Sequence, residues 1–110
     1  RCSTCAKARN WLNENQVAFE EIDIVKSPPT VDLLLKLITA KQHPLKYFFN
    51  TSGIKYRQLG LKDKVDKLSP QAASQLLASD GKLIKRPLMV ENDRFTCGFK
   101  ADIYRQNWLN

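Results

Sequence analysis

Two cysteines, Cys2 and Cys5, stand three positions apart at the start of the chain. An α-helix rises ~1.5 Å per residue, so both side chains lie on one side of a turn if the helix begins at Cys2. Their Cα atoms then fall within the ~4.4–6.8 Å that a disulfide requires. The spacing therefore suits a pair that cycles between two thiols and a disulfide.

The two cysteines of such a pair have different environments. The N–H groups and the positive dipole end at a helix N-terminus stabilise a thiolate, and Arg1 acts in the same direction. Cys2 is therefore expected to be the nucleophile. Cys5 lies one turn further along, on an apolar face with Ala8 and Leu12, and is expected to resolve a bond formed at Cys2.

Two other uses of the cysteines remain open. A metal site needs further ligands, and Cys97 and His43 are available, but neither belongs to a second paired motif of the kind that zinc sites show. Alternatively, both cysteines are small helix residues without chemistry. We favour the redox interpretation and expect neither a metal nor a cofactor.

A proline at the start of a predicted strand is the second candidate feature. Pro87 cannot donate a hydrogen bond there, and an X–Pro bond is where a cis peptide costs least. In thioredoxin-like folds, a cis-proline loop faces the cysteine turn and binds substrate beside it. An ordinary proline that begins a strand is the other interpretation.

Composition bounds the class of protein. A chain of 110 residues is expected to form one domain, spanning residues 1–110, and 43% hydrophobic residues are ordinary for a globular fold. Three cysteines do not make a secreted disulfide framework, so we expect a cytoplasmic protein. The apolar runs carry charges and do not suit a membrane span. The net charge of +7 is spread along the chain without a nucleic-acid motif, so direct nucleic-acid binding is not expected.

Periodicity predicts the elements that position these residues. Residues 4–15 form a helix, and "VAFEEIDIV" (17–25) is a strand candidate with irregular alternation. Thr30 caps a helix that runs to about Lys41, and "KYFF" forms a short helix. Residues 50–61 form a polar connector, and Ser69 begins a helix that stops at Asp80-Gly81. The buried stripe of the helix after Thr30 is predicted to contain Val31, Leu34, Leu35 and Ile38.

Toward the C-terminus, the hydrophobic pattern changes from the spacing of helices to the alternation of strands. "RPLMV", the turn "END" and "RFTC" predict a β-hairpin, and Gly98 leads into a last helix that carries Ile103, Tyr104 and Trp108.

Three other residues have ordinary structural interpretations. Cys97 is expected to be a small buried residue and His43 an exposed loop residue, and Asn50 either donates to an anion or lies in a solvated loop. Lysines 55, 62, 64 and 67 are expected to form a solvated face.

Several motifs occur together in one order along nearly the whole chain. They are Cys2-Ser3-Thr4-Cys5 followed by Ala8 and Trp11-Leu12, then "NTSGIKYRQLGLKDK", "SDGKLIKRPLMV" and "CGF". With these motifs the chain resembles the arsenate-reductase (ArsC-type) and Spx family. The resemblance implies an α/β, thioredoxin-like sheet with an inserted helical segment at about residues 30–80. The family's first strand precedes the cysteine turn, so this strand is expected to be missing from a chain that begins at Arg1 without methionine.

The resemblance implies two different functions. Glutaredoxin-dependent arsenate reductases attack arsenate with one cysteine, which matches Cys2, and hold the oxyanion with three arginines. Only Arg86 is present here, because the other two positions fall near Asn50 and Gly98. Losing two guanidinium groups removes most of the charge-assisted hydrogen bonds to a polyanion. Spx-type regulators use a CxxC pair as a disulfide switch and bind the C-terminal domain of the RNA polymerase α subunit.

The leading hypothesis is an arsenate-reductase-like thiol–disulfide oxidoreductase, with glutaredoxin and glutathione or thioredoxin as electron donor. The alternative is an Spx-like redox-sensing regulator that binds the RNA polymerase α subunit, with a docking surface around Ser52-Gly53. The expected site consists of catalytic Cys2, Cys5 and Arg86, and of substrate-binding Ser3, Thr4, Asn50 and Pro87.

Overall fold

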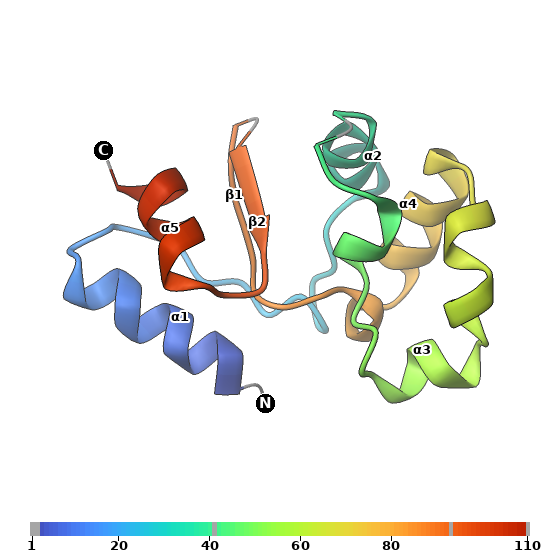
Figure 1. Ribbon diagram of the computed structural model, residues 1–110, viewed down its shortest axis with the longest axis horizontal. Helices are drawn as coiled ribbons and strands as arrows, with labels where there is room; N and C mark the ends of the chain where they lie inside the picture. The colour runs from blue at the N-terminus through green and yellow to red at the C-terminus, as the bar shows by residue number, and fades with distance from the viewer. Residues whose placement is uncertain (1–2, 41, 93, 110) are drawn as a thin grey trace. The chain divides into compact units, whose positions relative to one another are not determined.

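The computed structural model describes residues 3–40, 42–92 and 94–109, in two compact units (Figure 1). Unit 1 joins the two ends of the chain, Arg1–Glu21 and Arg86–Asn110, whereas unit 2 is the continuous stretch Ile22–Lys85. Among the described residues, no helix is both long and apolar enough to cross a bilayer.

Unit 1 contains helix α1 (Ser3–Glu14), a β-hairpin and helix α5 (Ala101–Trp108). The hairpin strands β1 (Leu88–Glu91) and β2 (Arg94–Cys97) are antiparallel, and their register runs from the pair Leu88 and Cys97 to the pair Glu91 and Arg94. The predicted hairpin and both predicted helices are therefore confirmed. The helix at the start of the chain begins within one residue of the position that its periodicity predicts.

Aromatic side chains form the core of unit 1. The ring of Tyr104 meets the ring of Trp11 edge-on, with centroids 5.5 Å apart, and the ring of Phe99 at 4.8 Å. The Trp108 Nε1–H donates to the Thr96 hydroxyl at 3.1 Å, in a buried environment. This cluster joins α1 and α5 through the buried residues Ala8, Trp11, Leu12, Tyr104 and Trp108.

Unit 2 is helical apart from one isolated bridge between Phe49 and Ile84, among the residues described. Thr30 caps α2 by accepting a hydrogen bond from the Leu33 N–H at 3.1 Å, and Ser69 caps α4 in the same way from Ala72. Both predicted caps are confirmed. The elements are α2 (Val31–Thr39), η1 (Leu45–Phe48), α3 (Ile54–Gln58), η2 (Leu61–Asp63), η3 (Val65–Lys67), α4 (Pro70–Ser79) and η4 (Gly81–Leu83).

The prediction of a strand at residues 17–25 is wrong. This stretch has no strand, and its apolar side chains Phe19, Ile22 and Val25 are exposed. A strand exists only with a hydrogen-bonded neighbour, and none of the described residues forms a ladder with this stretch. The β-branched residues of this stretch favour an extended backbone locally, but the stretch forms no strand without a hydrogen-bonded neighbour.

Three smaller predictions also differ from the structure. The buried residues of α2 are Leu34, Leu37 and Ile38, whereas Val31 and Leu35, which were also predicted to be buried, are only half-buried. The helix ends at Thr39, and Lys41 lies outside the described residues. The polar connector contains the short helix α3, whose Tyr56 is buried. Ile103 in α5 is 38% exposed, because the core contacts of this helix pass through Tyr104 and Trp108 instead.

Candidate redox site

Helix α1 positions the predicted resolving cysteine. Cys2 lies outside the described residues, and α1 begins at the next residue, Ser3. Ser3 is exposed, and Thr4 and Cys5 are half-buried in the first turn. The first N–H groups of a helix have no partners within it, and this first turn holds no acidic residue. The positive end of the helix is therefore not neutralised by a carboxylate of its own first turn.

Packing of the later turns fixes the direction of α1. Ala8, Trp11 and Leu12 are buried in the aromatic cluster, and the Arg9 guanidinium forms a 2.6 Å ion pair with Glu21. Cys5 precedes Ala8 by three positions, so it lies at the edge of the same helix face. The apolar face anchors the helix, and the first turn stays at its accessible end.

The predicted cis-proline is present in unit 1. The peptide bond between Arg86 and Pro87 is cis, and β1 begins at the next residue, Leu88. The Gly98 N–H donates to the Pro87 carbonyl at 2.9 Å, which extends the hairpin contact by one residue beyond the pair Leu88 and Cys97. The cis bond is therefore observed, whereas the predicted approach of this loop to the cysteine turn and its role in substrate binding stay predictions.

Arg86 is the one predicted oxyanion-binding arginine. It is half-buried, and among the described residues its guanidinium has neither a carboxylate nor a carbonyl partner. The other arginine of the hairpin region, Arg94, is different, because it donates to the Asn107 carbonyl at 2.7 Å and lies over the Trp108 ring. Arg94 therefore contacts the fold, whereas the predicted role of Arg86 in binding an oxyanion stays a prediction.

Asn50 belongs to unit 2 and already has hydrogen bonds there. Its N–H donates to the Leu83 carbonyl at 2.8 Å, its own carbonyl accepts from Gly53, and its side-chain Nδ2 lies 3.5 Å from the Lys82 carbonyl. The side-chain contact is long, so the amide is weakly held. Its predicted role in substrate binding stays a prediction.

Cys97 and His43 have the environments that their sequence context indicated. Cys97 is 7% exposed in β2. His43 is exposed, and its ring stacks on Tyr47 with centroids 3.8 Å apart. Desolvation by partial burial lowers the pKa of His43 below its ordinary value of 6.5. The histidine is therefore expected to be mostly neutral at pH 7.

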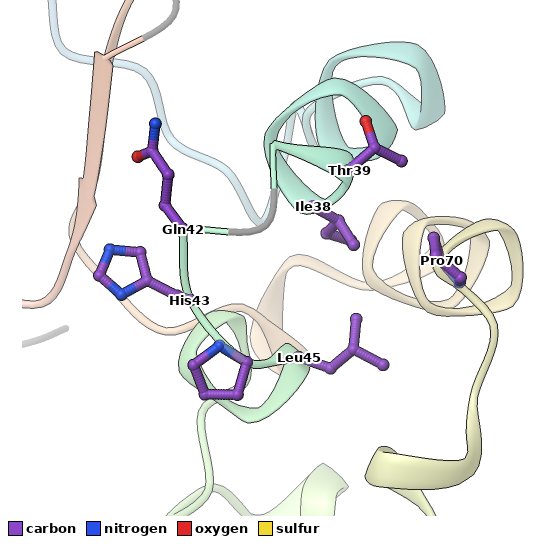
Figure 2. Close-up of a pocket in the computed structure, with 7 residues that line it drawn as sticks. Ile38, Thr39, Gln42, His43, Leu45 and Pro70 are labelled. Carbon is purple, nitrogen blue, oxygen red and sulfur yellow. The ribbon is translucent and has the colours of Figure 1, made fainter.

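A cavity of about 430 Å³ lies in unit 2, and none of the predicted site residues is among its described lining residues. Figure 2 shows Ile38 and Leu45 pointing into it, with Gln42 and His43 along the connecting loop. Among the described residues, its lining contains no cysteine, and His43 is its one titratable side chain.

Sequence reasoning missed the backbone role of Gly98. Its φ of +77° lies in the left-handed region that favours glycine, and this conformation accompanies the N–H contact with Pro87. The signal available in the sequence was a glycine directly after a strand, next to a half-buried aromatic residue, Phe99. In the sequence, the motif "CGF" indicated only the family resemblance and a position that lacks an arginine.

Comparison with known proteins identifies the family. A model of the ArsC family matches residues 1–107. This chain belongs to the ArsC family. The uncharacterized protein YusI of Bacillus subtilis is 46% identical over 108 residues, which cover 98% of this chain and 92% of YusI. The global transcriptional regulator Spx of Streptococcus mutans is 33% identical over 104 residues, which cover 94% of this chain and 74% of Spx.

A solved structure supports the same assignment for this ArsC-family chain. The crystal structure of a possible arsenate reductase from Streptococcus mutans is 45% identical, with a TM-score of 0.87. The match covers 92% of this chain and 86% of that one. The predicted α/β, thioredoxin-like family is therefore confirmed, and the chain is similar both to arsenate-reductase-like proteins and to Spx.

Proposed function

We propose that this protein is an arsenate-reductase-like thiol–disulfide oxidoreductase, with Cys2 as the nucleophile and Cys5 as the resolving thiol. One observation carries the proposal: α1 begins directly after Cys2 and has Cys5 in its first turn, which contains no acidic residue. A helix N-terminus favours a thiolate over a thiol. Because Cys2 immediately precedes α1 in the sequence and Cys5 follows it by three positions, the proposal assigns the attack to Cys2 and the resolution to Cys5.

The reaction proceeds as two exchanges when the oxidant is a disulfide, RSSR′. The Cys2 thiolate attacks one sulfur, forms a mixed disulfide with R–S, and releases R′S⁻. The thiol of Cys5 loses its proton to solvent, and its sulfur then attacks Cys2, which releases RS⁻ and forms the Cys2–Cys5 disulfide. The substrate gains two electrons and the protein loses two. A dithiol donor such as reduced thioredoxin, or glutaredoxin with glutathione, returns them and restores both thiols.

Arg86 supports an anionic substrate in this scheme. Its guanidinium is half-buried and without a partner among the described residues, so binding an anion breaks no existing ion pair. Ser3 and Thr4 offer hydroxyl groups and N–H groups at the start of α1, and Pro87 lies beside Arg86. Such charge-assisted bonds are shorter and stronger than neutral ones. A cytoplasmic location fits this function, because the donor must keep both thiols reduced.

Turnover tests the proposal. Purified protein is incubated with arsenate, or with a small disulfide, together with either glutaredoxin, glutathione and glutathione reductase or thioredoxin and its reductase, and NADPH consumption is followed. Mild oxidation without donor is expected to remove two thiols and to lower the intact mass by two hydrogens, with Cys2 and Cys5 joined in the peptide map. No turnover with any pair, or a map that joins Cys2 to Cys97, contradicts the mechanism.

The similarity to Spx favours a second candidate, a redox-sensing regulator that binds the RNA polymerase α subunit. In this interpretation the surface around Ser52-Gly53 docks the partner, and Lys55 lies beside it, in a 3.6 Å ion pair with Asp80. A pull-down with the C-terminal domain of that polymerase subunit, with the cysteines reduced and then oxidised, tests it. Binding in one redox state without turnover selects the regulator, and turnover without binding selects the enzyme.

A further inference from the structure

Gly98, which directly follows β2, contacts the backbone next to Arg86. It is buried, its φ is +77°, and its N–H donates to the Pro87 carbonyl at 2.9 Å. Pro87 directly follows Arg86, which is the first residue of unit 1 after the chain leaves unit 2. The hydrogen bond therefore holds the backbone next to Arg86, whose guanidinium has no partner of its own among the described residues.

The residues on both sides of Gly98 are fixed by the core. Before it, Thr96 accepts the 3.1 Å hydrogen bond from the Trp108 indole, and Cys97 pairs with Leu88 in the hairpin. After it, the Phe99 ring lies 4.8 Å from the Tyr104 ring. With both neighbours anchored, the backbone of Gly98 has little freedom to turn, and its N–H points at one acceptor.

We infer that Gly98 is a positioning residue for Arg86. The left-handed conformation of Gly98 directs its N–H to the Pro87 carbonyl, and this contact sets where the Arg86 guanidinium lies. The inference rests on the proposed function, because it assigns Arg86 a ligand-binding task. It implies that a glycine controls the anion affinity of the site and, if Arg86 serves the proposed nucleophile as the proposed function assigns, the reactivity of Cys2.

A matched pair of alanine variants separates positioning from stability. Gly98→Ala places an L-residue in the left-handed region, which is unfavourable for any side chain. Gly60→Ala does the same in unit 2, where φ is +63° and the nearest atom to an added Cβ is the flexible end of Lys64, at 3.8 Å. Both variants place an L-residue at a positive φ, but only the first changes the residue that contacts Pro87.

The readouts are the pH profile of Cys2 alkylation by iodoacetamide, resolved by peptide mass, and the affinity for inorganic phosphate. Gly98→Ala is expected to move the alkylation midpoint to higher pH and to weaken phosphate binding roughly two- to tenfold, the range of one lost hydrogen bond. Gly60→Ala is expected to lower the melting temperature without changing either quantity. Equal profiles for the two variants overturn the inference.

Semisynthesis adds a rescue and a direct test of the N–H. Cys97 immediately precedes Gly98, so a synthetic peptide of residues 97–110 can be joined to residues 1–96 by native chemical ligation without changing the sequence. D-alanine at position 98 suits a positive φ and keeps the N–H, so it is expected to restore the native profile. Glycolic acid at this position replaces the N–H with an ester oxygen, which cannot donate to the Pro87 carbonyl, and also weakens the Cys97 carbonyl as an acceptor; it is expected to reproduce the Gly98→Ala profile in a folded chain.

The outcomes distinguish the two proposals. If Cys2 of the native protein alkylates like an ordinary thiol and phosphate does not bind, the proposed function fails and this inference fails with it. If native Cys2 is reactive but the glycolic acid chain matches the native profile, the proposed function stands and the positioning role of Gly98 is wrong.

Discussion

Unit 1 and unit 2 are built in opposite ways. Unit 1 joins the first 21 residues to the last 25 and carries every predicted site residue except Asn50. Unit 2 is continuous in sequence and helical, and it holds most of the fully buried large side chains, such as Leu34, Leu77 and Phe48. Of these fully buried large side chains among the described residues, Tyr104 belongs to unit 1.

The candidate reactive groups therefore belong to one unit and most of the tightly packed core belongs to the other. In unit 1 the candidate groups lie at ends of elements: the first turn of α1, and the residues just before β1 and just after β2. In unit 2, α2 and α4 pack against each other through side chains that are completely buried. Substitutions in unit 1 are therefore expected to change reactivity, and substitutions in unit 2 are expected to change stability. Four predictions test this division.

The largest expected effect comes from the cysteines of unit 1. Cys2→Ser is expected to abolish both turnover and rapid alkylation near neutral pH, because it removes the attacking sulfur. Cys5→Ser is expected to keep the first attack and to accumulate a mixed disulfide until an added thiol such as glutathione resolves it. Iodoacetamide rates against pH and intact mass measure both outcomes. Rapid alkylation in Cys2→Ser but not in Cys5→Ser would reverse the two roles.

The core of unit 2 provides the opposite test. Leu34 has no exposed surface, so Leu34→Ala is expected to lower the free energy of unfolding by about 2–5 kcal/mol. The alkylation rate of Cys2 in the folded protein is expected to stay within about twofold of the native rate, since Leu34 and α1 belong to different compact units.

Denaturant unfolding and alkylation under native conditions measure these two effects. Leu59→Ala is the matched control, because Leu59 is 43% exposed and the same atoms are removed. Its effect on stability is expected to be within about 0.5 kcal/mol. A large change of Cys2 reactivity in Leu34→Ala, measured where the protein is fully folded, would show that the two units are coupled.

A smaller change is expected from Arg86→Ala in unit 1. Removing a charge-assisted hydrogen bond is expected to weaken phosphate or arsenate binding at least about tenfold, while the melting temperature changes little. Arg105→Ala is the control, since Arg105 is an exposed arginine of α5 in the same unit and its removal changes the net charge equally. Equal affinities for the two variants would show that Arg86 is only a surface residue.

The smallest effect is expected at Tyr56 in unit 2. Its hydroxyl is buried without a hydrogen-bond partner among the described residues, so Tyr56→Phe is expected to raise the free energy of unfolding by about 1 kcal/mol or less at pH 7. Desolvation, and then the charges of Asp66 and Asp63, raise the pKa of Tyr56 above 10.0.

The raised pKa gives this prediction a pH dependence with a definite sign. The unfolded chain releases the phenol proton from about pH 10, before the folded chain does, so the native protein loses stability as the pH rises above that value. Tyr56→Phe is expected to remove this loss, so the difference between the melting temperatures of the two proteins should widen above pH 10. A constant difference from pH 7 to pH 11 would contradict the buried, neutral phenol.

The structure confirms those sequence predictions that depend on near neighbours. Thr30 and Ser69 cap helices through hydrogen bonds to N–H groups three residues later, so their residue types and positions are sufficient. The hairpin follows from two short apolar runs around a polar turn, and α1 follows from its apolar face. The start of α1 between the two cysteines is also local, and the redox hypothesis depends on it.

Features that depend on contacts between residues far apart in the sequence were decided only by the tertiary structure. The strand predicted at residues 17–25 is absent because a strand needs a neighbour, which local propensity does not supply. The buried stripe of α2, a helix that packs against α4, contains Leu37 and not Leu35. Gly98 acquired its contact with Pro87 because the hairpin and the aromatic core bring together residues eleven positions apart. The sequence by itself determined the cysteine spacing and the local helix that serves it, whereas the placement of the Arg86–Pro87 backbone depends on packing between elements far apart in the chain.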